Sequence, residues 1–249
     1  MKSEESLPAD ALRITESPRP CSYVEGETAT LEYRLFRELS PRHVELLLER
    51  GWRRFGTHLF RPACESCSKC VPMRVVVDDF RPSKSQRKVL NKNSHIEVSL
   101  HRPAVTQEHL DLYNAWHVDM TERRGWKLQQ SSIDDYVDGF LEGDFPSLHE
   151  LRYFDHEKLV GVGLVDVLPN SISSAYFYHD PNWRGLSPGT FSMMCEIDFA
   201  KKLQLSYLYL GYWIEECLSM SYKNRFSPSE ILHGYPDDET FPDWKEYSR

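Results

Sequence analysis

In its first half, the hydrophobic positions of this chain mostly follow a helical spacing. Ser40 and the proline after it precede apolar residues three and four positions apart, which predicts a capped helix that ends at Gly51. Strand-like residues follow, and a strongly basic helix is expected over 82–93. Amphipathic spacing predicts two further helices, over 106–125 and 131–142.

In the second half, the pattern changes to strands. Residues 148–154 and 159–167 are expected to pair as antiparallel strands, and a third strand is expected over 172–178. A helix over 191–203 then leads to a strong strand over 207–212. This order is typical of an antiparallel sheet with one helical crossover to a parallel neighbour. It predicts an α+β fold with an acetyltransferase-like mixed sheet in the C-terminal half.

Composition divides the chain into four predicted parts. They are a loose polar arm over 1–20, a Cys-containing basic region over 21–105, the mixed-sheet domain over 106–233, and an acidic tail over 234–249. The length of 249 residues and the hydrophobic fraction of 40% are sufficient for a folded core. No stretch approaches 18 uncharged apolar residues, and the first residues lack a signal-peptide pattern. We therefore expect a cytosolic protein with no membrane span.

The charges of the chain are unevenly distributed. The net charge is −8, which argues against a generally basic nucleic-acid binder. Residues 50–93 nevertheless carry 11 Lys and Arg against 3 Asp and Glu. This basic island indicates either a directed contact with an anionic partner or an ordinary solvated face.

Three cysteines at C-x2-C-x2-C spacing, Cys64, Cys67 and Cys70, form the sharpest local motif. Thiolates at this spacing can converge on one ion or cluster, and Cys21 or His58 is the candidate fourth ligand. The spacing suits zinc or an iron–sulfur cluster and does not choose between them. Structural thiols without metal are the alternative.

Three further segments carry candidate chemistry. Asp180 and the histidine before it lie at the end of a predicted strand, where a general base can be placed, although Asp-Pro is also common turn chemistry. Residues 207–213 alternate Tyr with apolar residues, which suits a groove for stacking or a half-buried strand. Residues 184–190 precede a helix, but Pro188 removes an N–H donor, so this loop is a poor coenzyme A cradle.

Several short blocks in colinear order over about residues 18–233 carry a family resemblance. They are Cys21–Gly26, Trp52–Gly56, Arg61–Arg74, Phe80–Leu90, Tyr176–Pro181, Ser187–Thr190, Tyr207–Ile214 and Met220–Phe226. As a set, they resemble the aminoacyl-tRNA–protein transferases, in their bacterial aspartate/glutamate leucyltransferase branch. An ordered set of this length is far more specific than any single motif.

The resemblance implies transfer of an amino acid from aminoacyl-tRNA to the N-terminal α-amine of proteins that start with Asp or Glu, which marks them for degradation by the N-end rule. It favours leucyl-tRNA as donor, whereas eukaryotic relatives use arginyl-tRNA. Those relatives also carry an iron–sulfur cluster, which extends the cluster hypothesis to Cys21, Cys64, Cys67 and Cys70. The chemistry itself requires no cofactor, because the ester donor is already activated.

This reaction needs cations for the acceptor carboxylate and the tRNA phosphates, an apolar pocket for leucine, and a proton acceptor. Asp180 is the candidate proton acceptor, with Tyr178 beside it as a second candidate catalytic residue. The candidate substrate-binding residues are the cations Arg53, Arg54, Arg74, Lys84, Arg87, Lys223 and Arg225, and the pocket residues Phe177, Tyr209 and Trp213.

Two other functions stay open from the sequence. One is an acyl-CoA N-acyltransferase on the same fold, against which the poor coenzyme A loop counts. The other is a non-enzymatic metal-knuckle module that binds RNA, which leaves the aromatic C-terminal half unexplained.

Overall fold

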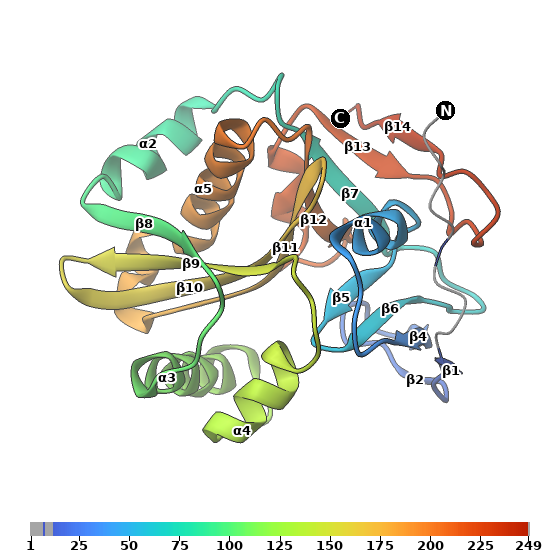
Figure 1. Ribbon diagram of the computed structural model, residues 1–249, viewed down its shortest axis with the longest axis horizontal. Helices are drawn as coiled ribbons and strands as arrows, with labels where there is room; N and C mark the ends of the chain where they lie inside the picture. The colour runs from blue at the N-terminus through green and yellow to red at the C-terminus, as the bar shows by residue number, and fades with distance from the viewer. Residues whose placement is uncertain (1–6, 8–11, 249) are drawn as a thin grey trace.

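An eight-stranded mixed sheet forms the centre of the fold (Figure 1). The computed structural model describes residue 7 and residues 12–248. The strand order is β14-β13-β7-β12-β11-β10-β9-β8. The strands are β7 (Val71–Val76), β8 (Ile96–His101), β9 (Leu148–Asp155), β10 (Lys158–Val167), β11 (Ser171–His179), β12 (Tyr207–Trp213), β13 (Ser229–Leu232) and β14 (Trp244–Glu246).

The helices cover both faces of this sheet. In Figure 1, α2 and α5 lie together on one side of the sheet, and α3 and α4 lie on the other. The larger core packs on the α5 side, and a second apolar cluster packs between α3, α4 and β10–β11. The helices are α1 (Pro41–Glu49), α2 (Lys84–Lys92), α3 (Gln107–Arg124), α4 (Ile133–Tyr136) and α5 (Pro188–Lys202), with the short π-helix η1 (Val137–Leu141) and the 3-10 helices η2 (Pro181–Leu186) and η3 (Ser221–Arg225).

A smaller sheet of order β1-β4-β6-β5 lies beside α1. Its strands are β1 (Leu12–Thr15), β4 (Leu31–Leu35), β5 (Arg53–Phe55) and β6 (His58–Pro62), and β2 (Arg19–Pro20) pairs with β3 (Thr28–Ala29). The predicted cap of α1 is confirmed, because Ser40 accepts a hydrogen bond from the first turn of this helix. Ser83 and Thr106 cap α2 and α3 in the same way.

The order β9-β10-β11-α5-β12 confirms the predicted acetyltransferase-like mixed sheet. β11 and β12 are parallel neighbours joined by α5, and the other strand pairs of this sheet are antiparallel. The sheet also contains β7 and β8 from the predicted basic region and β14 from the predicted tail. Three of the four sequence-based parts therefore contribute to one sheet, because strands far apart in sequence pair side by side. The predicted loose arm is not loose where it is described, since its residues 12–15 and 19–20 form β1 and β2, which pair with β4 and β3.

The parallel ladder between β11 and β12 is short. It runs from Ser171–Tyr207 to Ser173–Tyr209 and stops there. On its other edge, β12 has an irregular register with β7 between Tyr209 and Gly211. The ends of β11 and β12 beyond the ladder leave room for a cavity between them.

Candidate active site

A cavity of about 430 Å³ opens where β11 and β12 separate. α5 lines one side, the C-terminal half of α3 lines another, and η3 closes a third. Much of the wall is apolar, which suits an aliphatic side chain. The apolar lining residues include Trp116, Met120, Phe177, Met193, Leu210 and Met220.

Arg53 reaches this cavity from β5. Its Nη2 donates to the carbonyl oxygen of Ser174 at 2.7 Å, and its buried Nη1 has no hydrogen-bond partner in the part of the chain that the structure describes. Burial lowers the pKa of Arg53, but an arginine stays protonated in proteins. The cavity therefore contains a fixed positive charge with one free donor.

Gly211 makes room for the Arg53 guanidinium. Its φ is +77°, and a Cβ at this position would lie 2.3 Å from Nη1 of Arg53. Both the left-handed backbone and the close approach require glycine here.

We expect Gly211→Ala to displace the Arg53 guanidinium and to lower the kcat/KM of the transfer reaction expected from the sequence at least about 10-fold, because even small misplacement of a positioning group is costly. Gly139→Ala is the matched control, since a Cβ on Gly139 would meet nothing within 4 Å. Steady-state kinetics of both variants test this. An equal loss of kcat/KM in both variants, or a loss in neither, would show that the space left by the missing Cβ of Gly211 does not position Arg53.

Glu196 projects from α5 into the same cavity and is 1% exposed. The Ser192 hydroxyl donates to its Oε1 at 3.0 Å, whereas Oε2 is buried and makes no hydrogen bond within the described residues. Burial raises the pKa of Glu196 to about 7, and Ser174, Ser192 and Arg53 oppose this rise. A carboxyl group with this pKa can exchange protons near neutral pH.

Lys223 of η3 lines the cavity as a second cation. Its Nζ donates to the carbonyl oxygen of Tyr212 at 2.7 Å. Burial, together with the charge of Arg53, lowers the pKa of Lys223 to about 7. A carboxylate that enters the cavity would favour the charged form of Lys223.

His179 at the end of β11 also lines the cavity. Its Nδ1 lies 2.8 Å from the carbonyl oxygen of Asp180, and a carbonyl only accepts, so Nδ1 carries the proton. Burial lowers the pKa of His179, which favours the neutral ring with Nε2 as an acceptor. The sequence placed this histidine at a strand end suited to a general base, but Asp180 was named as the candidate proton acceptor.

The two candidate catalytic residues occupy other places. The Asp180 carboxylate caps η2 by accepting from the backbone N–H of Asn182 at 2.8 Å, and it pairs with Lys158 Nζ at 2.5 Å. Burial opposes ionisation of Asp180, but these two hydrogen bonds outweigh it and lower the pKa, which makes the carboxylate a weak base. Tyr178 is buried on the α3 side, where its hydroxyl bonds to that of Tyr136 at 2.8 Å. Neither is among the described residues that line the cavity.

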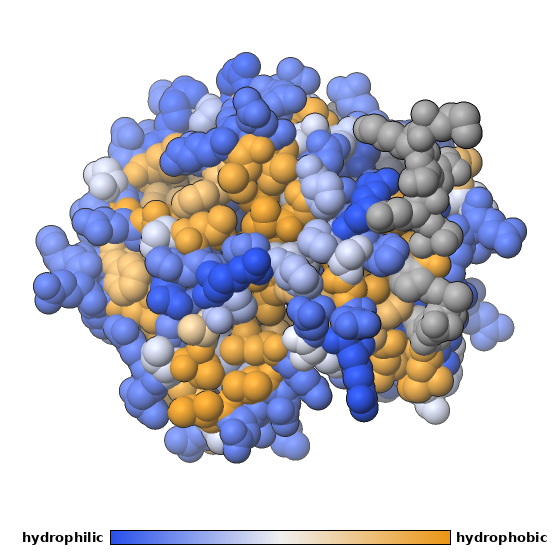
Figure 2. All heavy atoms as spheres, in the orientation of Figure 1, coloured by the Kyte–Doolittle hydropathy of each residue, from blue (hydrophilic) through white to orange (hydrophobic). Residues whose placement is uncertain are grey.

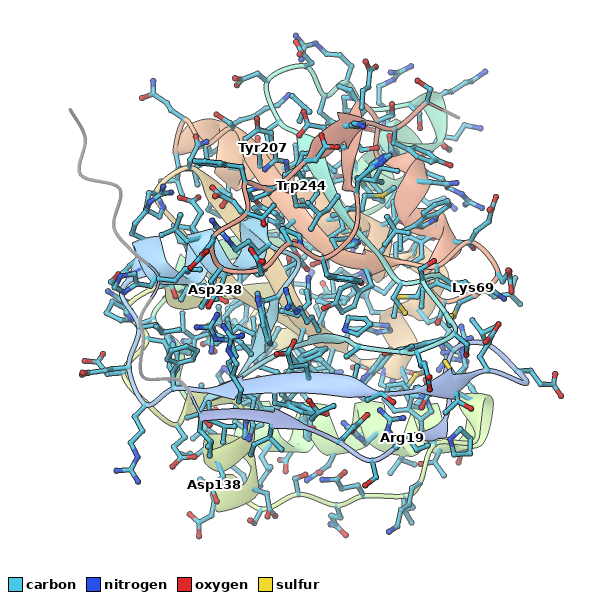
Figure 3. All side chains as sticks on the ribbon, turned by 90° about the vertical axis from the view of Figure 1, so that its right-hand side faces the viewer. Arg19, Lys69, Asp138, Tyr207, Asp238 and Trp244 are labelled. Atoms are coloured by element: carbon cyan, nitrogen blue, oxygen red, sulfur yellow. The ribbon has the colours of Figure 1, made fainter. Side chains whose placement is uncertain are left out.

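Arg54 and Arg74, both predicted as substrate-binding cations, have carboxylate partners within the chain. Arg54 and Asp166 form a buried ion pair with Nη2 and Oδ1 2.9 Å apart. Arg74 pairs with Glu230 at 2.7 Å and stacks between Tyr207 and Trp244, which lie near each other in Figure 3. Both arginines therefore have their charges paired within the chain, and neither is among the described residues that line the cavity.

Of the predicted leucine pocket, only Phe177 lines the cavity. The hydroxyl of Tyr209 accepts a hydrogen bond from Arg74 at 3.0 Å, and the ring packs in the apolar cluster with α1. Trp213 packs edge-on against Tyr247 in the larger core. Both residues are therefore packing residues at other places in the sheet.

The remaining predicted cations are exposed around α2. Lys84 and Arg87 lie on α2, and Arg225 is the last residue of η3. A hydrogen bond from Gln86 Nε2 of α2 to the carbonyl oxygen of Arg225, 3.1 Å long, connects the two helices. Figure 2 shows hydrophilic side chains along this upper edge of the molecule. Exposed cations at such an edge suit a polyanion rather than one buried carboxylate.

The four predicted metal ligands, Cys21, Cys64, Cys67 and Cys70, line one small cavity of about 100 Å³. Lys69 of this loop is labelled in Figure 3. Burial raises the pKa of Cys70 to about 12, and the neighbouring cysteines add to the rise. The described residues contain no group of three or more His, Cys, Asp or Glu arranged to hold an ion. Four thiols are suitable ligands for zinc or an iron–sulfur cluster. In this structure, however, their sulfur atoms do not converge on one point.

Comparisons with known proteins agree along nearly the whole chain. Sequence profiles described as "Arginine-tRNA-protein transferase, N terminus" and "Arginine-tRNA-protein transferase, C terminus" match residues 19–88 and 108–233. The aspartate/glutamate leucyltransferase of Helicobacter hepaticus is 39% identical over 92% of this chain and 95% of that protein. Proteins of the same name from Campylobacter jejuni and Pseudomonas syringae are 39% and 36% identical over 86% of this chain and 90% and 91% of theirs.

Among solved structures, that of L-PGS from Bacillus licheniformis is similar with a TM-score of 0.43 and 12% identity, over 79% of this chain and 69% of that one. No helix in the described part of the chain is long and apolar enough to cross a membrane. The two matching profiles and the long colinear matches to curated relatives show that the chain belongs to the arginine-tRNA-protein transferase family.

Proposed function

We propose that this protein transfers leucine from leucyl-tRNA to the N-terminal α-amine of proteins that start with Asp or Glu, and so marks them for degradation. The observation that carries the proposal is the cavity between β11 and β12, where the unpartnered Nη1 of Arg53 meets an apolar wall. A buried guanidinium is a ready site for a carboxylate, and the apolar wall suits the donor's side chain. The names of the curated relatives support the same donor and acceptors.

Binding in this cavity accounts for most of the catalysis. The donor ester is already activated, so the enzyme needs only to hold amine and ester carbonyl in contact and to exclude water. Such positioning is worth up to about 7–11 kcal/mol. Arg53 and Lys223 hold the acceptor carboxylate, which fixes the direction from which the amine attacks.

The charges of the cavity favour leucine over arginine as the transferred residue. Three cationic side chains, Arg53, Arg124 and Lys223, line the cavity together with a single carboxylate, Glu196. An arginyl side chain would add a further positive charge to this cavity, and like charges at close range are costly. An uncharged leucyl side chain packs against the wall without this cost.

The exposed cations around α2 are proposed to contact the tRNA. Lys84 and Arg87 project from α2, and Arg225 lies next to it on η3. Tyr222 of η3 lines both the active-site cavity and a second pocket at the start of α2, so the two places adjoin. Because aminoacyl-tRNA is made in the cytoplasm, we place the reaction there.

A transfer assay with purified protein tests the proposed function. Leucyl-tRNA and arginyl-tRNA are offered with peptides that start with Asp, Glu or Ala, and the products are identified by mass. We expect leucine on the Asp and Glu peptides, little on the Ala peptide, and little transfer of arginine. Transfer to all three peptides alike, or no transfer from either tRNA, would contradict the proposal.

We also propose that the four cysteines of the small cavity bind zinc or an iron–sulfur cluster. The support is the donor set, four thiols lining one space. Cys70 would lose its proton on binding, so binding should weaken as the pH falls. Metal content and visible absorption of the anaerobically purified protein distinguish zinc, a cluster and neither, and a protein that binds neither contradicts this proposal.

A further inference from the structure

The floor of the active-site cavity contains a carboxylate with a free, buried oxygen atom. Glu196 Oε2 accepts no hydrogen bond of normal geometry within the described residues, although Oε1 is held by Ser192 and the nearby Ser174 hydroxyl helps to lower the pKa of the carboxyl group. A buried acceptor without a partner is costly, so its presence in a native fold calls for an explanation. The residue lines the cavity, and a ligand there can supply the missing donor.

Arg53 provides a positive charge in the same cavity that complements the negative charge of Glu196. Its Nη1 is also buried and unpartnered, and the charges of Arg53 and Glu196 interact, but the described residues show no ion pair between these two side chains. A cation and an anion held apart in one cavity leave space for a ligand that carries both charges. An N-terminal Asp or Glu is such a ligand, because its ammonium and its carboxylate are a few bonds apart.

We propose that the Glu196 carboxylate binds the α-ammonium of the acceptor and removes one proton from it, while Arg53 holds the acceptor's side-chain carboxylate. This assignment rests on the proposed function. The neutral amine then forms the C–N bond to the ester carbon, and the C–O bond to the tRNA ribose breaks. The second nitrogen proton goes to the leaving ribose oxygen. Glu196 finally releases its proton to solvent, which restores the carboxylate and balances the reaction.

The surroundings of Glu196 set the pH range of this step. Burial raises its pKa to about 7, close below the usual 7.7–8.0 of an α-amine, so the proton transfer is nearly balanced. A carboxyl group of ordinary pKa would be a much weaker base. The charged and titratable groups that face it or line the same cavity are Arg53 from β5, Arg124 from α3, Tyr153 from β9, Tyr176 and His179 from β11, Tyr222 and Lys223 from η3, and Cys195 on its own helix.

Glu196→Gln tests the assignment, because it keeps the shape and removes the basic oxygen. We expect kcat to fall roughly 100- to 10,000-fold, with little change in the KM for leucyl-tRNA. Asp198→Asn is the matched control, because Asp198 lies on the same helix, pairs with Lys202 at the surface and is 58% exposed. Thermal unfolding of both variants checks that they fold, and Glu196→Asp should recover part of the activity.

The pH profile separates a proton-accepting role from a structural one. In the wild type, kcat should rise with pH as Glu196 loses its proton. In Glu196→Gln it should rise only as the free amine forms, at roughly one pH unit higher. An active wild type with an unshifted, nearly fully active Glu196→Gln variant would overturn the role of Glu196. A shift seen in His179→Gln instead would assign the base to His179 and equally overturn the proposal. A wild type without transfer activity would overturn the proposed function itself.

Discussion

Arg53→Gln should lower kcat/KM for acceptors that start with Asp or Glu by about 100-fold. The guanidinium is buried at the cavity, its Nη2 is fixed by the Ser174 carbonyl, and Nη1 is free to bind. Removing one partner of a buried, hydrogen-bonded charge pair costs roughly 2–5 kcal/mol, and a tenfold change is about 1.4 kcal/mol. Glutamine keeps a donor but loses the charge, so the effect should appear mainly as weaker acceptor binding.

The affinity of the Arg53→Gln variant for leucyl-tRNA provides its control. It should stay within about two- to threefold of the wild type, because the exposed cations around α2 are intact. A fluorescence titration with leucyl-tRNA and steady-state kinetics with an Asp peptide measure the two quantities separately. Equal loss of both would show that Arg53 serves the tRNA instead of the acceptor.

Arg54→Met should have the opposite signature, a large loss of stability with a modest direct effect on acceptor selection. Arg54 and Asp166 are 2% and 1% exposed as side chains, and Arg54 also donates to the carbonyl oxygen of Gly56 at 2.9 Å. Breaking such a buried pair leaves an uncompensated charge and costs about 3–5 kcal/mol. For a chain of this size that corresponds to a drop in Tm on the order of 10 °C.

Urea denaturation of Arg54→Met and of the double variant Arg54→Met/Asp166→Leu tests this reading. The double variant should recover most of the lost stability, because it removes the unpaired carboxylate. A single variant as stable as the wild type would show that the ion pair does not support the contact between β5 and β10. A stable Arg54→Met variant that discriminates poorly between acidic and neutral acceptors would show that Arg54 contributes to acceptor binding.

The contrast between these adjacent arginines shows where the sequence stops being informative. Successive side chains of a strand point to opposite faces, so one of Arg53 and Arg54 had to face away from any site on β5. Which one reaches the cavity depends on how β5 lies against β10 and β11, and those strands come a hundred residues later. The sequence therefore predicts the cationic pair but not the division of roles.

Local patterns predicted the elements well. The Ser40 helix cap depends on a few adjacent residues, and the order of strands and helix after residue 146 predicted the mixed sheet. Asp180 illustrates the limit of such patterns, because its carboxylate caps η2 and pairs with Lys158 from the neighbouring strand. No local signal shows that partner.

Glu196 had a signal that sequence reasoning passed over. It is a carboxylate within a run of apolar residues, Phe191 to Ile197, and a carboxylate on the buried face of a helix is rarely placed there without a partner or a role. The apolar wall from Trp116 and Met120 was harder to foresee. Those residues lie on α3, which packs on the other face of the sheet and meets the cavity only where β11 and β12 separate.

The central claim is that a buried positive charge in the cavity between β11 and β12 selects acidic N-termini for leucine. The most direct measurement compares peptides that differ only by Asp or Asn at the N-terminus, with leucyl-tRNA as donor and wild type or Arg53→Gln as enzyme. The account predicts that the wild type prefers Asp by about 100-fold or more, and that Arg53→Gln loses most of this preference. Equal rates for Asp and Asn with the wild type, or an unchanged preference in Arg53→Gln, would contradict it.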